Sequence, residues 1–275
     1  MQKVQVNSYL LWISFFYVAY LALKIWSPSA ESMYSLMGSL MVLVGALAGI
    51  QACASFGGSR NFTGRIALYF TLALLLVSIS MLASSLASAL NRSSSEVLSI
   101  TIFTSFIAAQ IISTIALMVS VRSVIYHLSA RTATYILLSA LFSIAIAWFN
   151  VTVGTQIGLI HSSADQIFWS GLLPVLIFLQ LASALVLIDL LGKWYGTHVI
   201  RTIALGFVCF DLLFPPATVY VFAAALSSLG DQVTALLTGV SLQAVTATYI
   251  VSFALTQMKP KQIGPFCSLH SASET

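Results

Sequence analysis

The sequence predicts an all-α integral membrane protein, a polytopic bundle of about eight transmembrane helices. Hydrophobic residues make up 59% of the 275 residues and charged residues only 7%, whereas soluble globular domains carry about 25% charged residues. Apolar runs recur along the whole chain, and about 20 such residues suffice for a helix to cross the bilayer core. The alternating segments of about ten residues that are typical of a membrane β-barrel are absent.

Eight spans follow from the apolar runs. They cover residues 8–26, 34–55, 66–90, 98–121, 133–153, 167–191, 202–226 and 233–257, so that residues 1–257 form a single bundle and residues 258–275 a short cytoplasmic tail. Turn-forming residues mark the breaks, namely Ser27-Pro28-Ser29, Phe56-Gly57-Gly58-Ser59, Asn91-Arg92-Ser93, Gly154, Gly192 and Gly230-Asp231. Because every connection is short, consecutive helices are expected to be antiparallel neighbours.

The basic residues predict that both termini lie in the cytoplasm. If the spans alternate, one side receives Lys3, Arg60, Arg65, Arg122, Arg131, Lys193, Arg201, Lys259 and Lys261. The other side receives only Arg92 and Lys24. Cytoplasmic loops carry the excess of Lys and Arg in membrane proteins, so the basic side is the inner one and the predicted location is the cell membrane.

The first span has an alternative interpretation as a cleaved signal peptide, which would leave seven helices and an outer N-terminus. Its basic region contains a single lysine, Lys3, and Pro28 would occupy the −3 position before Ala30. Both features depart from the usual pattern of a cleavage site.

Small residues at helical spacing predict close packing among the second, third and fourth spans. Lipid provides little hydrophobic force between helices, so close backbone approach and polar contacts must join them. The stripes consist of Gly38, Gly45 and Gly49, then Ser80, Ser84 and Ser88, then Ser105, Ala109 and Ser113. A hydrophilic pore lined by the serines is the alternative.

The main candidate site is Asp211, near the middle of the seventh span. An ionisable group at this depth is costly and usually faces protein or water. Pro215 and Pro216 have no N–H, so the carbonyls of residues 211 and 212 lose their helical donors, as in discontinuous helices that line ligand sites. Three glutamines at a similar depth could complete a proton, ion or small-ligand site: Gln110, Gln180 and Gln243. Alternatively, each amide simply bonds a neighbouring helix.

Several other classes of site find little support. His127 and His198 share a side and are the pair through which a haem would bind, but no histidine faces another within the spans, so no cofactor is predicted. The sequence has no HExxH zinc motif and no glutamate inside a span, so an enzyme is not expected. The three cysteines form no CxxC pair, which argues against a disulfide framework or zinc site. The basic residues are scattered singly, so nucleic acid is not an expected partner.

Three N-x-[ST] sequons occur, at Asn61, Asn91 and Asn150. In the predicted topology Asn61 is cytoplasmic and Asn150 lies in or beside the fifth span. Asn91 is therefore the predicted glycosylation site if the source cell modifies such sequons.

A family resemblance rests on short motifs over about half of the chain. They are Ser163-Ala164-Asp165-Gln166-Ile167-Phe168-Trp169-Ser170-Gly171, Leu205-Gly206, Asp211-Leu212-Leu213-Phe214 and Tyr220, with Gly57-Gly58-Ser59 and Gly64-Arg65 before the third span. The pattern resembles the multi-helix membrane sensor region of some archaeal and bacterial histidine kinases and related signalling proteins. No kinase domain follows the last predicted span, so the resemblance implies a sensor that signals through a separate protein.

Three functions are therefore expected. The first is a non-catalytic membrane sensor or assembly subunit, whose partners are the lipid bilayer and other membrane subunits. The second is a small-solute or proton-coupled transporter or channel with its site at Asp211. The third is a membrane subunit of a respiratory or oxidase complex that contacts quinone or haem.

The topology can be tested with single cysteines introduced at Ser94, Ser162 and Ser59. An impermeant thiol reagent added to intact cells should label the first two and leave the third unlabelled, because the charge asymmetry places only Ser59 inside. Labelling at Ser59 from outside would overturn the orientation.

Overall fold

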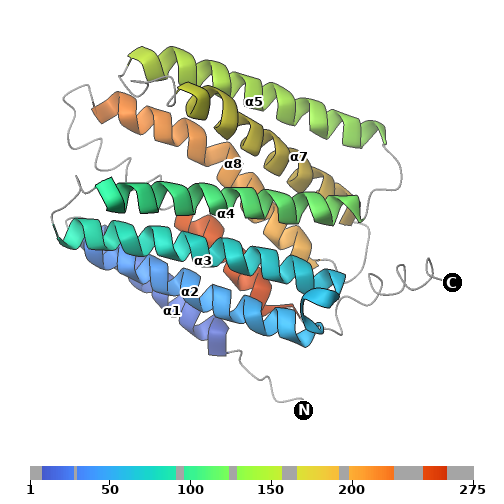
Figure 1. Cartoon of the computed structure of the whole chain (residues 1–275), viewed down its shortest axis with the longest axis horizontal. Helices are drawn as coiled ribbons and strands as arrows, with labels where there is room; N and C mark the ends of the chain where they lie inside the picture. The colour runs from blue at the N-terminus through green and yellow to red at the C-terminus, as the bar shows by residue number, and fades with distance from the viewer. Residues whose placement is uncertain are drawn as a thin grey trace. The chain divides into compact units, whose positions relative to one another are not determined.

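The computed structural model describes residues 8–27, 30–90, 96–123, 129–156, 166–191, 198–225 and 244–258, and these ranges contain helices and no strand. The long helices are α1 (Ser8–Trp26), α2 (Glu31–Ser55), α3 (Phe62–Ala89), α4 (Glu96–Arg122), α5 (Ala130–Gln156), α7 (Leu173–Leu191) and α8 (His198–Ala225), shown in Figure 1. Two short segments join them, the 3-10 helix η1 (Gly58–Arg60) and the π-helix η2 (Phe168–Leu172). A further apolar helix covers Ala244–Thr256.

The helices confirm the prediction of an all-α protein with apolar spans. Six of the described segments are long and apolar enough to cross a membrane, which indicates a multi-pass membrane protein: Ser8–Trp26, Ser32–Ser55, Phe62–Ala89, Ile100–Arg122, Ala130–Thr152 and Phe168–Leu190. The seventh predicted span coincides with α8. Part of the eighth, residues 233–243, lies outside the described residues.

The chain divides into two compact units, and the prediction of one bundle stays a prediction. The first contains α1, α2, α3, most of α4, the start of α8 and the end of the helix Ala244–Thr256. The second contains α5, η2, α7 and the remainder of α8. Each unit is described by itself below.

In the first unit, serine hydroxyls join α2 to α3. Ser39 Oγ donates to the carbonyl of Ser78 over 3.0 Å, and Ser78 Oγ lies 3.2 Å from the carbonyl of Ser39. Closer to the other end of the pair, Ser85 Oγ donates to the carbonyl of Ser32 over 2.7 Å. A hydroxyl that finds a carbonyl on the next helix is satisfied without water, which is the kind of contact that holds helices together in lipid.

The predicted stripe on α4 behaves differently from the stripe on α3. Ser80 on α3 donates to the carbonyl of Ile102 on α4 over 3.0 Å, as packing between these helices requires. Ser105 instead donates to the carbonyl of Thr101 in its own helix. Such back-bonding uses the hydroxyl proton within the helix, so that the hydroxyl does not donate to a neighbouring helix.

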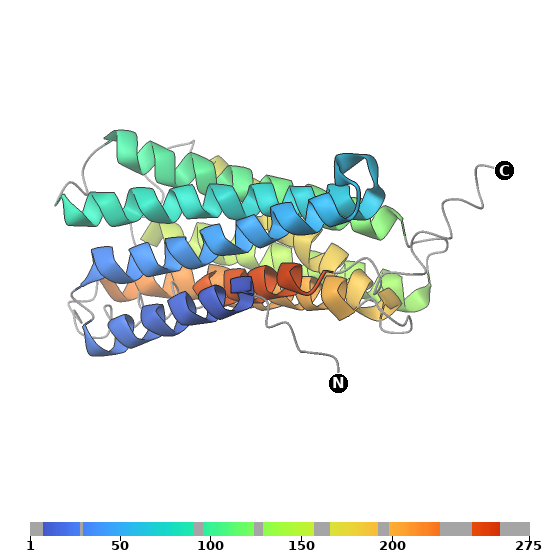
Figure 2. The same cartoon turned by 90° about the horizontal axis from the view of Figure 1, so that it is seen from below.

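The glycines of α2 pack against three different helices. Gly38 lies against Met81 and Tyr20, and Gly49 against Thr71 and Leu255. Gly45, which the sequence analysis assigned to packing among the second to fourth spans, packs instead against Ser252 of the helix Ala244–Thr256. Figure 2 shows this last helix running along α1 and α2.

Aromatic rings attach the same helix to α1. The rings of Tyr17 and Tyr249 stack with centroids 4.3 Å apart, and Ser14 Oγ lies 3.4 Å from the hydroxyl of Tyr249. The first unit therefore brings together segments from both ends of the sequence.

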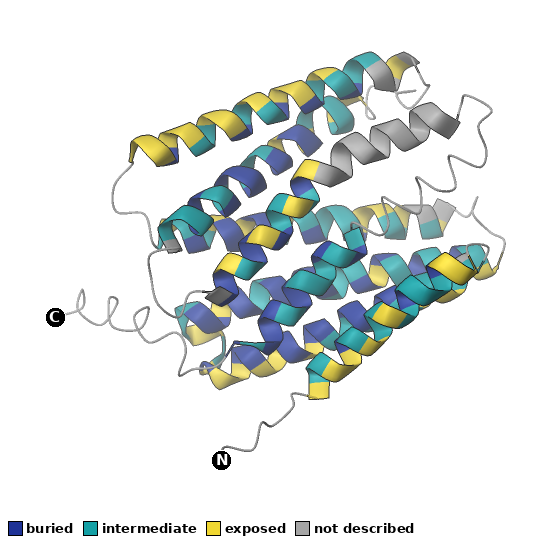
Figure 3. Ribbon diagram, turned by 180° about the vertical axis from the view of Figure 1, so that it is seen from behind, coloured by how far each residue is buried: buried dark blue, intermediate teal, exposed yellow. Residues whose placement is uncertain are grey.

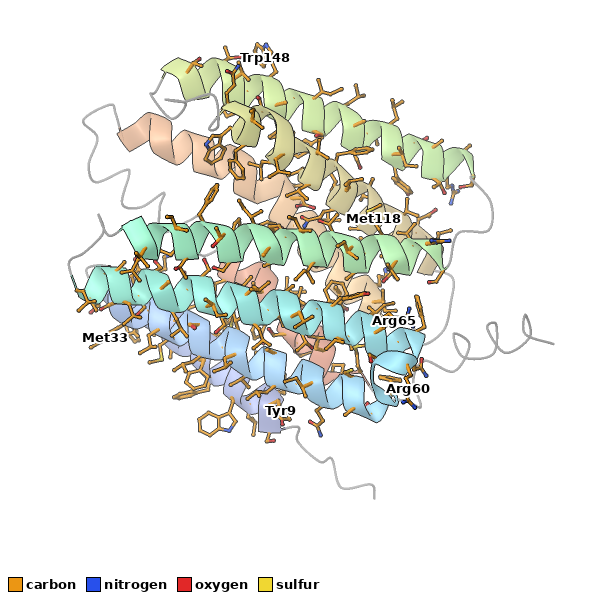
Figure 4. All side chains as sticks on the ribbon, viewed as in Figure 1. Tyr9, Met33, Arg60, Arg65, Met118 and Trp148 are labelled. Carbon is orange, nitrogen blue, oxygen red and sulfur yellow. The ribbon has the colours of Figure 1, made fainter. Side chains whose placement is uncertain are left out.

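The basic end of the α2–α3 pair is a tight turn. Gly57 and Gly58 adopt φ values of 81° and 76°, a left-handed conformation that glycine takes without a steric penalty. Asn61 caps α3, because its side chain accepts a hydrogen bond from the backbone N–H of Thr63 over 3.1 Å. Arg60 and Arg65, two of the residues that predict the cytoplasmic side, lie together at this end (Figure 4).

Lys24, an exception to the charge asymmetry, is buried at the end of α1 with 6% of its surface exposed. Its Nζ donates to the hydroxyl of Tyr20 over 2.9 Å. It also lies 5.2 Å from the ring centroids of both Tyr20 and Tyr34, within the range of a cation–π contact. The two tyrosines thus surround a charge that the apolar helix would otherwise carry into lipid.

Gly45→Ala should lower the free energy of unfolding by about 1–3 kcal/mol, as over-packing of a filled interface does. A β-carbon at Gly45 would lie 2.5 Å from Ser252 Cβ and 3.3 Å from its Cα. Adding Ser252→Gly removes the Cβ and should restore part of the loss. Thermal unfolding of the purified protein in detergent provides the measurement.

Ala54→Leu is the control for this series, because it adds side-chain atoms at an exposed position of the same helix. It should leave stability nearly unchanged. An equal loss at Gly45 and Ala54 would show that the space beside Ser252 has no part in the effect.

Candidate functional site

Asp211 lies halfway along α8, in the second unit, and its surroundings make it the strongest candidate site. The residue is 1% exposed, and its backbone belongs to a regular helix from His198 to Ala225. Among the residues that the structure describes, no donor reaches either oxygen of its buried carboxyl group. Buried polar side chains nearly always have a partner, so this group needs a specific explanation.

The prolines after Asp211 do not interrupt the helix. The backbone continues as a helix past Pro215 and Pro216 to Ala225. Proline has no N–H, so the carbonyl of Asp211, four residues before Pro215, still lacks its usual intrahelical donor. The side chains beyond Leu212 lie outside the description of the structure.

The glutamines of the predicted polar cluster fall in different places. Gln180 lies on α7 in the same unit as Asp211 and is 1% exposed, yet it makes no hydrogen bond to the carboxyl oxygens of Asp211. Gln110 is half-buried on α4, in the other unit. Gln243 lies outside the described residues.

Other residues singled out by the sequence are not placed in detail. His127 and Asn91 lie outside the described residues, and His198 begins α8 with its side chain not described. Within the described ranges, no three of histidine, cysteine, aspartate and glutamate gather in one place.

Sequence reasoning missed a second buried polar group, Asn150 on α5. It is 1% exposed, and its Nδ2 donates to the backbone carbonyl of Trp169 over 2.8 Å. Its Oδ1 has no partner among the described residues. In the sequence, Asn150 was identified only as part of a sequon. The burial of Asn150 between helices leaves no room for a glycan.

The carbonyl that Asn150 binds belongs to η2, the π-helical start of the sixth predicted span. Seven residues earlier on α5, Ser143 Oγ donates to the carbonyl of Pro174. Ile146, Leu173 and Ile177 form the apolar core between these two contacts. The signal in the sequence was Pro174 near the start of an apolar span, because a proline there removes a backbone donor.

No protein-family model, curated protein or solved structure matches the chain.

Proposed function

We propose that the chain is a non-catalytic transporter or channel that moves protons, alone or coupled to a small solute, and that Asp211 takes up and releases the proton. The buried carboxyl without a donor carries this proposal. Aspartate within a membrane span is rare, and where it occurs it marks ion pathways and proton relays.

A proton fits this site better than a metal ion or a solute does. Calcium takes six to eight oxygen ligands and magnesium an octahedral set, whereas a proton requires one carboxyl oxygen. A solute also needs a cavity beside the group that binds it, and both oxygens of Asp211 are buried. A proton occupies no volume of its own.

Protonation of such a group can also drive a conformational change. Adding or removing the proton changes the charge of Asp211 by one unit, and a charge in a low-dielectric interior interacts strongly with its surroundings. The surrounding helices therefore have a strong energetic reason to differ between the two states. A transport cycle requires a coupling of this kind.

The finer topology belongs to the same proposal. We infer eight spans in the cell membrane with both termini in the cytoplasm. The paired arginines at the turn between α2 and α3 and the shielded charge of Lys24 support this orientation.

A sensor or assembly subunit is the second candidate, and the largely exposed surfaces of α1 and α5 favour it. Only 17% of the apolar window of α1 and 22% of that of α5 are buried (Figure 3). On α1, Trp12 and Phe15 are more than half exposed and contact each other edge-to-face. An aromatic pair on an otherwise open helix is suited to contact another membrane subunit.

The proton proposal predicts that Asp211→Asn removes a titrating carboxyl group. Difference infrared spectra recorded between acidic and alkaline pH should contain a protonated-carboxyl band in the wild type that the variant lacks. Stability should change little, because among the described residues neither carboxyl oxygen accepts a hydrogen bond that the amide would lose. Proton flux into proteoliposomes under a membrane potential should also be lower for the variant than for the wild type.

Asp189→Asn is the matched control, since this half-buried carboxyl near the end of α7 has no part in the proposed site. It should retain both the band and the flux. Identical difference spectra for the wild type and Asp211→Asn, in correctly folded protein, would contradict the proton-binding role.

The assembly candidate predicts that a photo-crosslinking amino acid in place of Trp12 captures another membrane protein in native membranes. The same amino acid at Leu137, which is 59% exposed on α5, provides the comparison for a second open helix. Gel shifts and mass spectrometry identify the adducts. Lipid adducts alone at Trp12 would show that α1 faces the bilayer and would remove the observation on which this candidate rests.

A further inference from the structure

Where η2 passes into α7, the carbonyl of Trp169 is left without a helical donor. The N–H of Leu173 bonds to the carbonyl of Phe168, five residues earlier, in the π register. In the same register the next donor, for the carbonyl of Trp169, would be residue 174. That residue is proline and has no N–H. The carbonyl of Trp169 must therefore find its donor elsewhere.

Asn150 supplies this donor from the neighbouring helix. Its Nδ2 lies 2.8 Å from the carbonyl oxygen of Trp169, an ordinary hydrogen-bond length. The rings of Phe168 and Trp169 pack against the apolar core between α5 and α7, so the contact is shielded from water. One side-chain amide thus replaces the backbone N–H that Pro174 lacks.

The α register is the alternative for this segment. There the N–H of Leu173 would bond to the carbonyl of Trp169, four residues earlier. Pro174 would then leave the carbonyl of Ser170 without a donor. Pro174 therefore removes one backbone donor in either register, and only the π register leaves the carbonyl of Trp169 to accept from Asn150. An amide outside the helix selects between two hydrogen-bond patterns.

Only one of the two polar atoms of the Asn150 amide has a hydrogen-bond partner among the described residues. Asn150 Oδ1 is buried without a partner among the described residues, which is costly for a polar atom away from water. The π state therefore depends on a single side-chain contact, and π-bulges are frequent at functional sites.

We propose that η2 is a two-state joint at the start of the sixth span, with Asn150 as the positioning residue that holds it in the π register. Loss of the Asn150 contact returns the segment to the α register. A shift of one residue turns the chain before the joint by about 100° and moves it by about 1.5 Å relative to α7. The joint depends only on contacts between α5, η2 and α7, and stands apart from the proton role of Asp211.

The test measures the register directly with pairs of spin labels, in a chain whose three native cysteines are replaced by alanine. One pair joins Leu137 on α5 to Ile167, which precedes the joint and is 70% exposed. The other joins Leu137 to Val175, which follows it and is 53% exposed. Double electron–electron resonance gives the distances.

Asn150→Leu should shift the distance between positions 137 and 167 by several ångströms and leave that between 137 and 175 unchanged. Pro174→Ala, which restores the missing N–H, should shift the first distance in the same direction without touching Asn150. Ser143→Ala is the matched control, because its contact with the carbonyl of Pro174 lies beyond the joint. It should move neither distance.

Thermal unfolding provides the second readout. Asn150→Leu should lower the unfolding midpoint in the wild-type background and have much less effect in the Pro174→Ala background, where the backbone supplies the donor. Pro174→Ala also keeps the test informative if Asn150→Leu fails to fold. An equal loss in both backgrounds, or an unchanged distance between positions 137 and 167 in Pro174→Ala, would overturn the proposal.

Discussion

The structure depends on one constraint: within a bilayer, each polar group must find its partner inside the protein. Helices satisfy their own backbone, so only side chains and interrupted turns remain to be paired. Ser39 and Ser78 show the usual solution, in which each hydroxyl reaches a carbonyl of the facing helix. Lys24 shows a second solution, in which two tyrosines provide an oxygen and two ring faces for a buried cation. These contacts hold helices together because water does not compete for them.

Three examples show how much of the fold the sequence predicts. The bounds of α1, Ser8 and Trp26, match the predicted first span, because span length follows from bilayer thickness and local composition. The partner of Gly45 could not be predicted, since it lies on a helix about 200 residues later. The role of Ser105 was also beyond prediction, because a hydroxyl chooses between its own helix and a neighbour according to a distance that the local sequence does not contain.

The candidate site divides in the same way. Asp211 was predicted as the candidate from its apolar neighbours in the sequence, and its depth in the membrane stays a prediction. Its lack of a donor depends on which side chains face it from other helices, which no local pattern encodes. Pro174 indicates that a backbone carbonyl lacks its donor. It does not indicate the π register, nor that Asn150, 19 residues before Trp169, supplies the donor. Side-chain chemistry is therefore readable from the sequence, whereas pairing is a property of the assembled helices.

Asp211 and Asn150 are the two residues of the second unit whose buried polar atoms lack a partner among the described residues, and they differ in what can relieve them. An amide cannot change its charge, so Asn150 can gain a partner only if atoms move, and the segment that it contacts is η2. A carboxyl can change its charge without any movement of heavy atoms, by exchange of a proton. The unpaired oxygen of Asn150 can therefore be relieved only by a change of conformation, whereas the carboxyl of Asp211 can be relieved by a change of charge.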